Sequence, residues 1–440
     1  MRSQTSPKVE PLALVIRLLD SPPASGSLGM TYYFMKKIYL DNAATTPVDP
    51  EVLKEMLPYF SEKFGNPMSI HNFGQEALEA IDKARKQTSD FLNADPTEII
   101  FTSGATESNN LAIKGVIKKY YFGHKDNSQN PPAGEKPHII TTAFEHHCVL
   151  ESIKFLEKSG QAEITYLPVY EEGIVKLEDV KNAIKPNTIL ISIMYVNNEI
   201  GTVQPITEIG EMLKSYKLKA KSSILFHTDA TQAVNYFDCD VQKLGVDMLS
   251  LSGHKIYGPK GVGALYVKKG TPIAKIQDGG EQEFGMRAGT HNVTGIVGLG
   301  KAIELISKNK DNDKIKNLRD YLIEKVLKEI PDSYLNGSKE KRSPNNINFR
   351  FDNVEGESLV MSLDMEGIAA STGSACSSNT LEPSHVLLSL GLKQEQCHGS
   401  LRLTLGKDTT KEEIDYAIEK LKESVNRLRS ISGNILKDFS

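Results

Sequence analysis

The sequence has only four cysteines, no long hydrophobic run and no excess of positive charge. Cys148, Cys239, Cys376 and Cys397 form neither a CxxC pair nor a zinc-binding spacing, so a reducing, intracellular compartment is favoured over a disulfide framework. The formal net charge is −4, so the sequence lacks the excess of basic residues that is typical of a nucleic-acid-binding protein. No segment reaches the roughly 18 apolar residues that mark a membrane-spanning helix. We therefore expect a cytoplasmic protein with no membrane segment and no direct nucleic-acid partner.

The 440 residues exceed one ordinary hydrophobic core, which predicts about two domains. Residues 1–34 are interpreted as a weakly ordered N-terminal extension, because the short apolar stretch within them is interrupted by Arg17 and makes a poor secretory signal. Residues 35–300 are expected to form a large domain, whose first residues are free to pack on the smaller one. Residues 301–440 are expected to form that small C-terminal domain.

From residue 97 onward, short β-branched runs alternate with helical periodicity. Strands are expected at 98–103, 138–143, 188–195, 222–229 and 247–252, and most of these runs are nearly continuously apolar, as in strands buried on both faces of a sheet. The run 261–269 follows too closely for a crossover helix, so it is expected to pair antiparallel. This alternation predicts an α/β core with a mostly parallel sheet, followed after about residue 300 by an α+β region.

Polar side chains follow the ends of these expected strands. Parallel α/β sheets bind ligands at the carboxyl ends of their strands, so the residues found there indicate the function. In chain order they are Gly104-Ala105-Thr106 at a helix start, His146, Asn198, Asp229 with Gln232, and Ser252 with His254 and Lys255. A helix start, an imidazole, an amide, a carboxylate and a lysine together predict a site for pyridoxal phosphate.

Each of these residue types meets one chemical requirement of that cofactor. Free backbone N–H groups at the helix start that follows Gly104 can bind the phosphate, with Ser252 and His254 as further donors. A buried carboxylate such as Asp229 keeps the pyridine nitrogen protonated, so that the ring can act as an electron sink. Lys255 can form the Schiff base. Three further side chains can contact the cofactor ring. His146 can stack on it, and Asn198 and Gln232 can donate hydrogen bonds to its phenolic oxygen.

Taken singly, each residue also has a plain structural explanation. A Gly-Ala-Thr at a helix start is most often a cap, and an aspartate such as Asp229 at a strand end is often an N-cap. Lys255 alone would be a solvated surface lysine, and His146 alone a structural histidine. The prediction therefore depends on their joint order along one α/β chain.

Nine motifs, spread from about Ile38 to Ala417, resemble one known enzyme family. They are YLDNAATTP, FGNPMSIHNFG, FTSGATESNNLAIKG, EHHCVL, VNNEIGTVQPI, HTDATQAV, LSGHKIYGPKGVGALYV, GMRAGT and STGSACSSNTLEPSHVL. The family is that of the cysteine desulfurases, in their long-loop branch, which belong to the class V aminotransferases among the fold-type I pyridoxal-phosphate enzymes. The resemblance implies a large cofactor-binding domain with a mostly parallel seven-stranded sheet and a smaller α+β domain that carries a catalytic cysteine loop.

The resemblance also assigns roles residue by residue. It implies a Schiff base on Lys255, a homodimer in which Thr290 reaches the neighbouring subunit's cofactor, and no resident metal. It implies that Arg402 holds the carboxylate of the substrate through a two-pronged hydrogen bond, a task that favours arginine over lysine, with Asn198 beside it. The remaining cofactor contacts are implied at Ala105, Thr106, Ser252 and His254 for the phosphate and at His146, Asn198, Asp229 and Gln232 for the ring.

Cys376 lies in the stretch STGSACSSN, where no aliphatic or aromatic neighbour could bury its thiol. The resemblance implies that Cys376, Lys255 and His146 are catalytic: the thiolate takes the sulfur of L-cysteine as a persulfide and L-alanine is released. The persulfide would pass to an iron–sulfur scaffold or a sulfur-carrier protein, for cluster assembly or for thiolation of tRNA or cofactors, and Cys376 could transiently ligate a cluster. The other cysteines are expected to be buried at a helix start (Cys148), structural (Cys239) and an accessory thiol near Arg402 (Cys397).

Two other classes of function compete with this interpretation. The same fold serves selenocysteine lyases and true aminotransferases, but neither explains a flexible arm around Cys376. A chain that had lost catalysis and acts as a scaffold or adaptor has no reason to keep Lys255, His146 and Asp229 together.

Overall fold

The computed structural model describes residues 37–122, 136–220, 223–308, 312–373 and 383–438, all of which belong to one unit, Lys37–Ser440. The expected extension 1–34 and the predicted nucleophile Cys376 lie outside the described residues. Among the described residues, no helix is both long and apolar enough to cross a bilayer.

The larger sheet has seven strands, mostly parallel, as predicted. Its order is β2 (Ile99–Thr102), β8 (Gly263–Val267), β7 (Met248–Ser252), β6 (Leu225–Asp229), β5 (Thr188–Ser192), β3 (His138–Thr142) and β4 (Glu163–Leu167). Strand β8 is antiparallel to both of its neighbours, and the pairs from β7 to β4 are parallel. The sequence predicted six of these strands and missed β4, because this edge strand is mostly half-buried and has no continuous apolar run.

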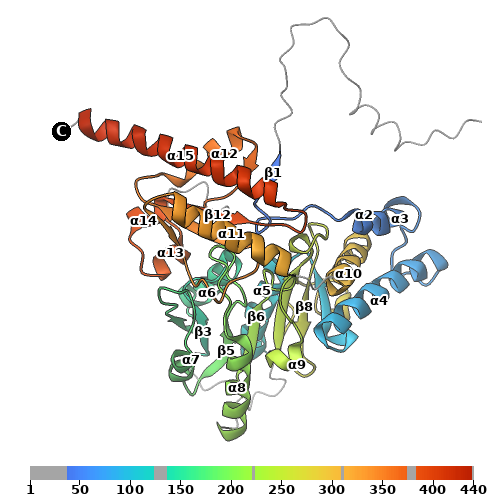
Figure 1. Cartoon of the computed structure of the whole chain (residues 1–440). Helices are drawn as coiled ribbons and strands as arrows, with labels where there is room; N and C mark the ends of the chain where they lie inside the picture. Colours follow the sequence, from blue (N-terminus) through green and yellow to red (C-terminus); the bar gives the residue numbers. More distant parts are fainter. Residues whose placement is uncertain (1–36, 123–135, 221–222, 309–311, 374–382, 439–440) are drawn as a thin grey trace, which may run out of the picture. The chain divides into compact units, whose positions relative to one another are not determined.

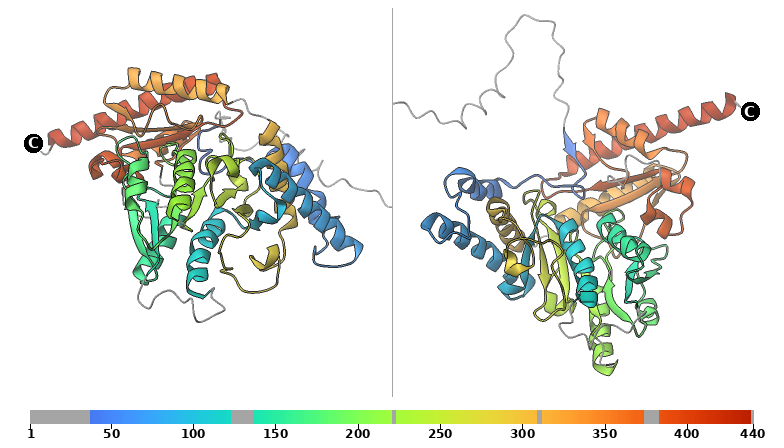
Figure 2. Two further views of the ribbon diagram at one scale, coloured as in Figure 1. Left: turned by 90° about the horizontal axis from the view of Figure 1, so that it is seen from below. Right: turned by 180° about the vertical axis from the view of Figure 1, so that it is seen from behind.

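Two layers of helices enclose this sheet (Figures 1 and 2), because successive residues of a strand point to opposite faces. On β6, for example, Leu225 belongs to one hydrophobic cluster and Phe226 to another. The cluster on one face includes residues of α5 (Ala105–Phe122) and α6 (His147–Lys158). The cluster on the other face includes residues of α4 (Asn72–Leu92), α8 (Ile206–Ala220) and α10 (Val293–Lys308).

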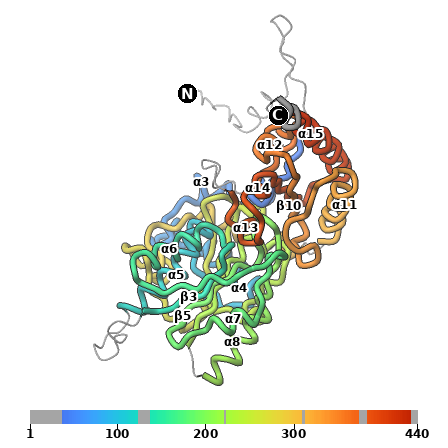
Figure 3. The backbone as a smooth tube through the Cα atoms, turned by 90° about the vertical axis from the view of Figure 1, so that its left-hand side faces the viewer, coloured from blue at the N-terminus to red at the C-terminus, as the bar shows by residue number. Residues whose placement is uncertain are grey.

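A second core gathers around a smaller antiparallel sheet, in the order β12 (Ser400–Thr404), β10 (Asn346–Phe351) and β9 (Ser333–Leu335). Figure 3 shows α11 (Asp313–Glu329), α12 (Gly356–Met365) and α15 (Lys411–Asp438) gathered beside β10. The start of the described chain joins this core, because β1 (Ile38–Tyr39) pairs with β11 (Ile368–Ala369) and Leu40 is buried among its residues. The α+β character expected after residue 300 is therefore confirmed, while the domain boundary itself stays a prediction.

The remaining, shorter elements lie between these along the chain. They are α2 (Pro50–Met56), α3 (Pro58–Ser61), η1 (Pro96–Glu98), α7 (Leu177–Ala183), α9 (Val241–Leu244), η3 (Gly253–Lys255), η4 (Glu283–Gly285), α13 (His385–Ser389) and α14 (Gln394–His398).

The sheet topology brings the polar strand ends to one edge. Strands β3, β5, β6 and β7 run in the same direction, and β2 shares it because both β2 and β7 are antiparallel to β8. The segments that follow these five strands are those in which the sequence placed the candidate site. They meet at the carboxyl edge of the sheet, where α/β proteins bind ligands.

Candidate active site

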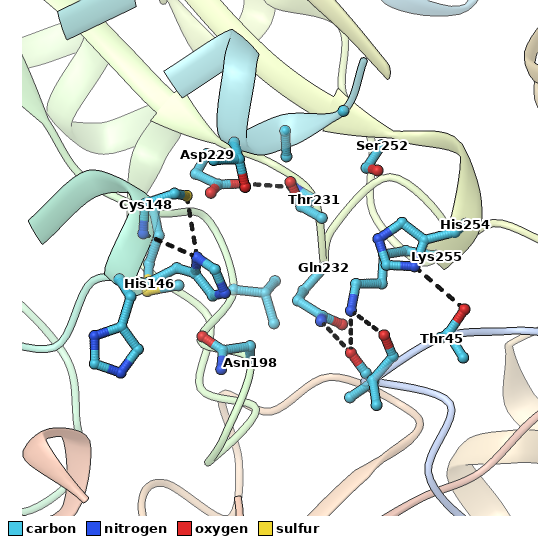
Figure 4. Close-up of a pocket in the computed structure, with 18 of the residues that line it drawn as sticks. Thr45, His146, Cys148, Asn198, Asp229, Thr231, Gln232, Ser252, His254 and Lys255 are labelled. Atoms are coloured by element: carbon cyan, nitrogen blue, oxygen red, sulfur yellow. Dashed lines mark hydrogen bonds between the residues drawn. The ribbon is translucent and has the colours of Figure 1, made fainter. Parts of the chain in front are cut away.

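A cavity of about 540 Å³ lies at this edge. It is lined by every described residue that was predicted for the chain's own cofactor and substrate site: Ala105, Thr106, His146, Asn198, Asp229, Gln232, Ser252, His254, Lys255 and Arg402. Figure 4 shows the side chains of Asp229, His146 and Lys255 around the same open space. The side chains that were separated along the sequence are thus brought together, whereas their roles stay predictions.

Asp229 is a buried carboxylate at the last position of β6, with only 5% of its surface exposed. Its Oδ2 atom accepts a hydrogen bond of 2.6 Å from Asn109 Nδ2, and its Oδ1 atom accepts one of 2.9 Å from the backbone N–H of Thr231. These donors fix the carboxylate at the cavity wall. The sequence did not point to Asn109, although its place one turn after Ala105 in α5 was a signal that it faces the same site.

Lys255 lies in η3, directly after β7, and its amine points into the cavity instead of into bulk water. Its Nζ atom donates hydrogen bonds to the carbonyl oxygens of Ala43, at 2.5 Å, and Ala44, at 2.7 Å. Gln232 Nε2 also donates to Ala43 O, at 3.0 Å. The explanation of Lys255 as a solvated surface lysine is therefore wrong.

The end of the cavity near β2 has the features of an anion site. Gly104 turns the chain with a φ of +148°, a conformation that side-chain-bearing residues rarely adopt, and α5 begins at the next residue. The backbone N–H groups of the first turn of a helix have no partners within the helix and attract anions. His254 lines the same cavity, and burial, together with Lys255 and Lys260, lowers its pKa to about 4, so its imidazole is neutral near pH 7.

Arg402 reaches the cavity from β12 of the smaller sheet and is almost fully buried. Its Nη1 atom donates to the carbonyl oxygens of Asn198, at 3.0 Å, and Gly373, at 3.1 Å, and its Nη2 atom donates to Asp41 Oδ1 at 2.8 Å. Its Nε atom is buried and has no hydrogen-bond partner among the described residues. The Nε–H of the guanidinium group is therefore a buried donor without a partner among these residues.

Other buried polar atoms at the cavity wall share this property. Buried polar groups in proteins are nearly always hydrogen-bonded, so such atoms indicate a missing partner. Within the described ranges, the side-chain atoms without a partner include Asn198 Oδ1, Thr231 Oγ1 and His147 Nε2, and all three residues line the cavity. The wall is thus suited to a polar ligand that carries both donors and acceptors.

Two histidines that the sequence did not single out also line the cavity. The ring centroids of His147 and His385 are 4.7 Å apart, and His385 Nε2 donates to the carbonyl oxygen of Glu145 at 2.9 Å. Burial lowers the pKa of both imidazoles. His147 stands beside the predicted His146, but no local signal connects it with His385, which lies more than two hundred residues further along the chain.

The remaining cysteines differ in part from their expectations. Cys148 is in the first turn of α6, as expected, but it is only half-buried and lines the cavity. Burial and the charge of Asp229 raise its pKa to about 12, so it stays a thiol. Cys239 is buried, as expected of a structural residue. The prediction of an accessory thiol at Cys397 is wrong, because this residue is buried in the core of the larger sheet.

Thr290 is exposed, on the loop between η4 and α10, and it does not line the cavity of its own chain. Cys376 lies outside the described residues. The described residues on either side of its segment include Gly373 and His385, and both of these line the cavity.

Comparison with known proteins agrees with this geometry. The Aminotransferase class-V family model matches residues 38–417. Cysteine desulfurase IscS of Clostridium botulinum is 51% identical over 401 residues, which cover 90% of this chain and 96% of that protein. A solved NifS-like protein has a TM-score of 0.80 at 37% identity, covering 89% of this chain and all of its own. A solved structure of SspA in complex with cysteine has a TM-score of 0.72 at 40% identity, covering 84% and 99%.

The chain belongs to the class V aminotransferase family. Its fold is that of the fold-type I pyridoxal-phosphate enzymes, and its cofactor is pyridoxal phosphate, the cofactor of this family. The cavity fits this group, because it offers a helix start for a phosphate, a buried carboxylate for a ring nitrogen and a lysine amine. Among the described residues, no cluster of three metal-ligating side chains is present.

Glu145 is a buried acid behind the cavity, between the ends of β3 and β5. Its Oε1 atom accepts hydrogen bonds from Thr142 Oγ1, at 2.7 Å, and from the backbone N–H of Met194, at 2.9 Å, whereas its Oε2 atom has no partner in the described structure. Burial raises its pKa from the ordinary value of 4.5 to about 8. The protonated form is therefore favoured near neutral pH.

This pKa makes the stability of the protein depend on pH. Between about pH 5 and about pH 8 the folded chain keeps a proton on Glu145 that the unfolded chain has lost, so this residue destabilises the fold as pH rises. We predict that Glu145→Gln, which resembles the protonated acid, gains stability over the unmodified chain as pH increases through this range. Urea unfolding at several pH values measures the difference. The exposed Glu151→Gln is the control, and parallel curves for Glu145→Gln and the unmodified chain would contradict the prediction.

Proposed function

We propose that the chain is a cysteine desulfurase, which converts L-cysteine to L-alanine and carries the sulfur as a persulfide on Cys376. The observation that carries the proposal is the combination, in one cavity, of the Lys255 amine, the buried Asp229 carboxylate and the unpartnered Nε–H of Arg402. The relatives named cysteine desulfurase, and a neighbour solved in complex with cysteine, support the same reaction.

Pyridoxal phosphate, when bound, withdraws electrons from the α carbon of an amino acid. Lys255 would carry the group covalently, and Asp229 would hold the ring nitrogen in its protonated form, with its carboxylate kept in place by Asn109 and Thr231. The start of α5 would bind the phosphate. The other contacts that we assign to the group are those of Ala105, Thr106, His146, Asn198, Gln232, Ser252 and His254.

Arg402 would bind the carboxylate of L-cysteine. Both hydrogen bonds of its Nη1 atom are used by Asn198 O and Gly373 O, so the carboxylate would approach the edge that carries Nε. This fixes the orientation of the amino acid, because an arginine fork and a carboxylate pair in a plane. Lys255 Nζ would then remove the proton on the α carbon.

The sulfur transfer is assigned to Cys376 from the sequence. Its thiolate would attack the sulfur of the substrate, so that the bond between sulfur and the β carbon breaks and a sulfur–sulfur bond forms on the protein. The electron pair of the broken bond stays with the carbon skeleton, which takes up one proton at the β carbon, regains a proton at the α carbon in place of the one that Lys255 removed, and leaves as L-alanine. Cys148 is a poor candidate for this step, because its raised pKa keeps it a thiol and the thiolate is the nucleophile.

The acceptor of the persulfide is proposed as an iron–sulfur scaffold or a sulfur-carrier protein, and the compartment as the cytoplasm. A selenocysteine lyase or an aminotransferase on the same fold is the competing activity. It predicts turnover that does not depend on Cys376.

A homodimer is the proposed assembly. Large apolar side chains are exposed along the segment around α2 and α3 and the residues that follow, with Phe60 63%, Phe64 65% and Ile70 96% exposed. Patches of this kind in soluble proteins mark interaction sites. Thr294 Oγ1 donates to Tyr59 O at 3.2 Å and holds the start of α10 against this segment. The exposed Thr290 lies four residues before Thr294. Because the resemblance implies that Thr290 reaches the cofactor of a neighbouring subunit, the partner that we propose for this patch is a second copy of the chain.

We expect sedimentation equilibrium to give twice the chain mass of 48.6 kDa. The double variant Phe64→Asp/Ile70→Asp should shift the population toward the monomer, because it places charge in the apolar patch. Met361→Asp is the matched control, since Met361 is 70% exposed on α12 and outside the patch. A monomeric unmodified chain at micromolar concentration would contradict the assembly.

Covalent attachment of the cofactor tests the assignment of Lys255. The purified protein should absorb at about 420 nm, as a protonated pyridoxal Schiff base does, and borohydride should fix the group to the chain. We expect Lys255→Ala to lose this covalent label, whereas Lys260→Ala, which changes the other lysine at the cavity wall, should keep it. Label that persists in Lys255→Ala would refute the assignment.

Intact-mass analysis after incubation with L-cysteine tests the reaction and its nucleophile. We expect an increment of about 32 Da, one sulfur atom, on Cys376 and an equal amount of L-alanine. Cys376→Ser should keep the colour and bind L-cysteine but form almost no sulfide. The buried Cys239→Ser serves as the control for loss of a thiol. Sulfide release at the unmodified rate from Cys376→Ser would exclude the persulfide mechanism.

A further inference from the structure

The side chain of His146 forms the N-cap of α6. The residue has φ −61° and ψ 147°, and its Nδ1 atom accepts a hydrogen bond of 3.2 Å from the backbone N–H of Cys148. The thiol of Cys148 lies 3.0 Å from the same nitrogen. One ring nitrogen of His146 is therefore occupied by the start of the helix, and the other lies on the opposite side of the ring (Figure 4).

The N-cap bond determines where the ring proton is. A nitrogen that accepts an N–H must present its lone pair, so Nδ1 carries no proton. Burial lowers the pKa of this imidazole; Lys255, His147 and His385 act in the same direction and Asp229 opposes them. The ring is consequently neutral near pH 7, and its single proton is on Nε2.

A chain of side-chain hydrogen bonds supports the same state. Asn109 Nδ2 donates both to Asp229 Oδ2, at 2.6 Å, and to Cys148 Sγ, at 3.1 Å. The Cys148 thiol, which stays protonated because burial raises its pKa to about 12, can donate its own proton to His146 Nδ1, so that the thiol and the backbone N–H of Cys148 share the single lone pair of this nitrogen. In this series of hydrogen bonds each donor faces an acceptor, and the last donor, the Cys148 thiol, faces His146 Nδ1.

We propose that the N-cap of α6 locks His146 in the Nε2–H form, so that His146 acts on the substrate as a hydrogen-bond donor and not as a base, with Cys148 and Asn109 as the positioning residues. The part of this inference that concerns the substrate rests on the proposed function. To act as a base, the ring would have to take up a proton at Nδ1, and that proton would face the N–H of Cys148 and break the cap. A proton lost from the substrate thiol would therefore go to a group other than His146.

The protonation state can be observed directly on the full chain. Nitrogen-15 NMR of histidine-labelled protein distinguishes a protonated from an unprotonated Nδ1, and the signals of His146 are those that vanish in His146→Gln. We expect the neutral Nε2–H form at pH 7.5, both with the cofactor and after its removal. A protonated Nδ1 at this pH would overturn the proposal. This readout does not depend on turnover, so it separates a failure of the inference from a failure of the proposed function.

Two substitutions separate the two nitrogens of the ring. Asparagine at position 146 keeps an acceptor for the N–H of Cys148 but has no donor where Nε2 lies, and asparagine is a good N-cap. Glutamine can place an amide N–H where Nε2 lies but is a poor cap. We expect His146→Asn to keep the melting temperature and to lose activity by about 100-fold or more. His146→Gln should melt at a lower temperature and yet turn over faster than His146→Asn.

Equal activity of the two variants, or the reverse order, would overturn the donor role. His147→Asn and His147→Gln are the matched controls, because the neighbouring histidine does not cap the helix, so this opposite ranking of stability and activity should be absent there. Cys148→Ala tests the positioning role, since the loss of a donor to Nδ1 should raise the pKa of His146 in the NMR titration. Cys148→Ser should restore it. An unchanged pKa in Cys148→Ala would exclude a role for the thiol.

Discussion

The cavity depends first on the parallel pairing of β3, β5, β6 and β7. Parallel register brings the carboxyl ends of all four strands to one edge, so that segments separated by dozens of residues deliver their first polar side chains to the same place. The pairing is held from both faces by apolar clusters, in which Leu225 and Phe226, or Met248 and Leu249, point in opposite directions. A slip of one residue in any strand would exchange these faces and carry the polar end group away from the cavity.

A second constraint joins the two cores at the cavity. Arg402 comes from the smaller sheet, and its guanidinium group is held by Asn198 O, next to β5, and by Asp41, just after β1. Burial of an arginine is costly unless it is paired and hydrogen-bonded. The bond to Asn198 ties the smaller sheet to the larger one, whereas Asp41 belongs to the smaller core, where it pairs with Thr404. The site that we propose for the substrate carboxylate is therefore formed by packing between cores and not by one strand end.

The sequence was most informative where the signal is local. His146, Asp229 and Lys255 each follow an apolar run within a few residues, and the sheet topology alone then brings them together. Asn109 was missed because a polar residue inside a helix gives no sign of its partner. The pairing of His385 with Glu145 was missed because it joins residues on different parts of the chain, and no periodicity reports such a contact. Cys397 was misjudged for the same reason, since nearness to Arg402 along the chain does not place its thiol in the cavity.

Burial gives the cavity its electrostatic character. It is the first cause of the lowered pKa values of His146, His147, His254 and His385, and of the raised pKa values of Glu145, Glu199 and Cys148. In each case burial favours the neutral form of the side chain. A site whose titratable walls are mostly neutral would leave the charges of the phosphate and the carboxylate that we propose there to interact with a few fixed partners, such as the start of α5 and Arg402. Because these partners are held by backbone and buried contacts before any ligand arrives, little reorganisation is needed when charge develops there.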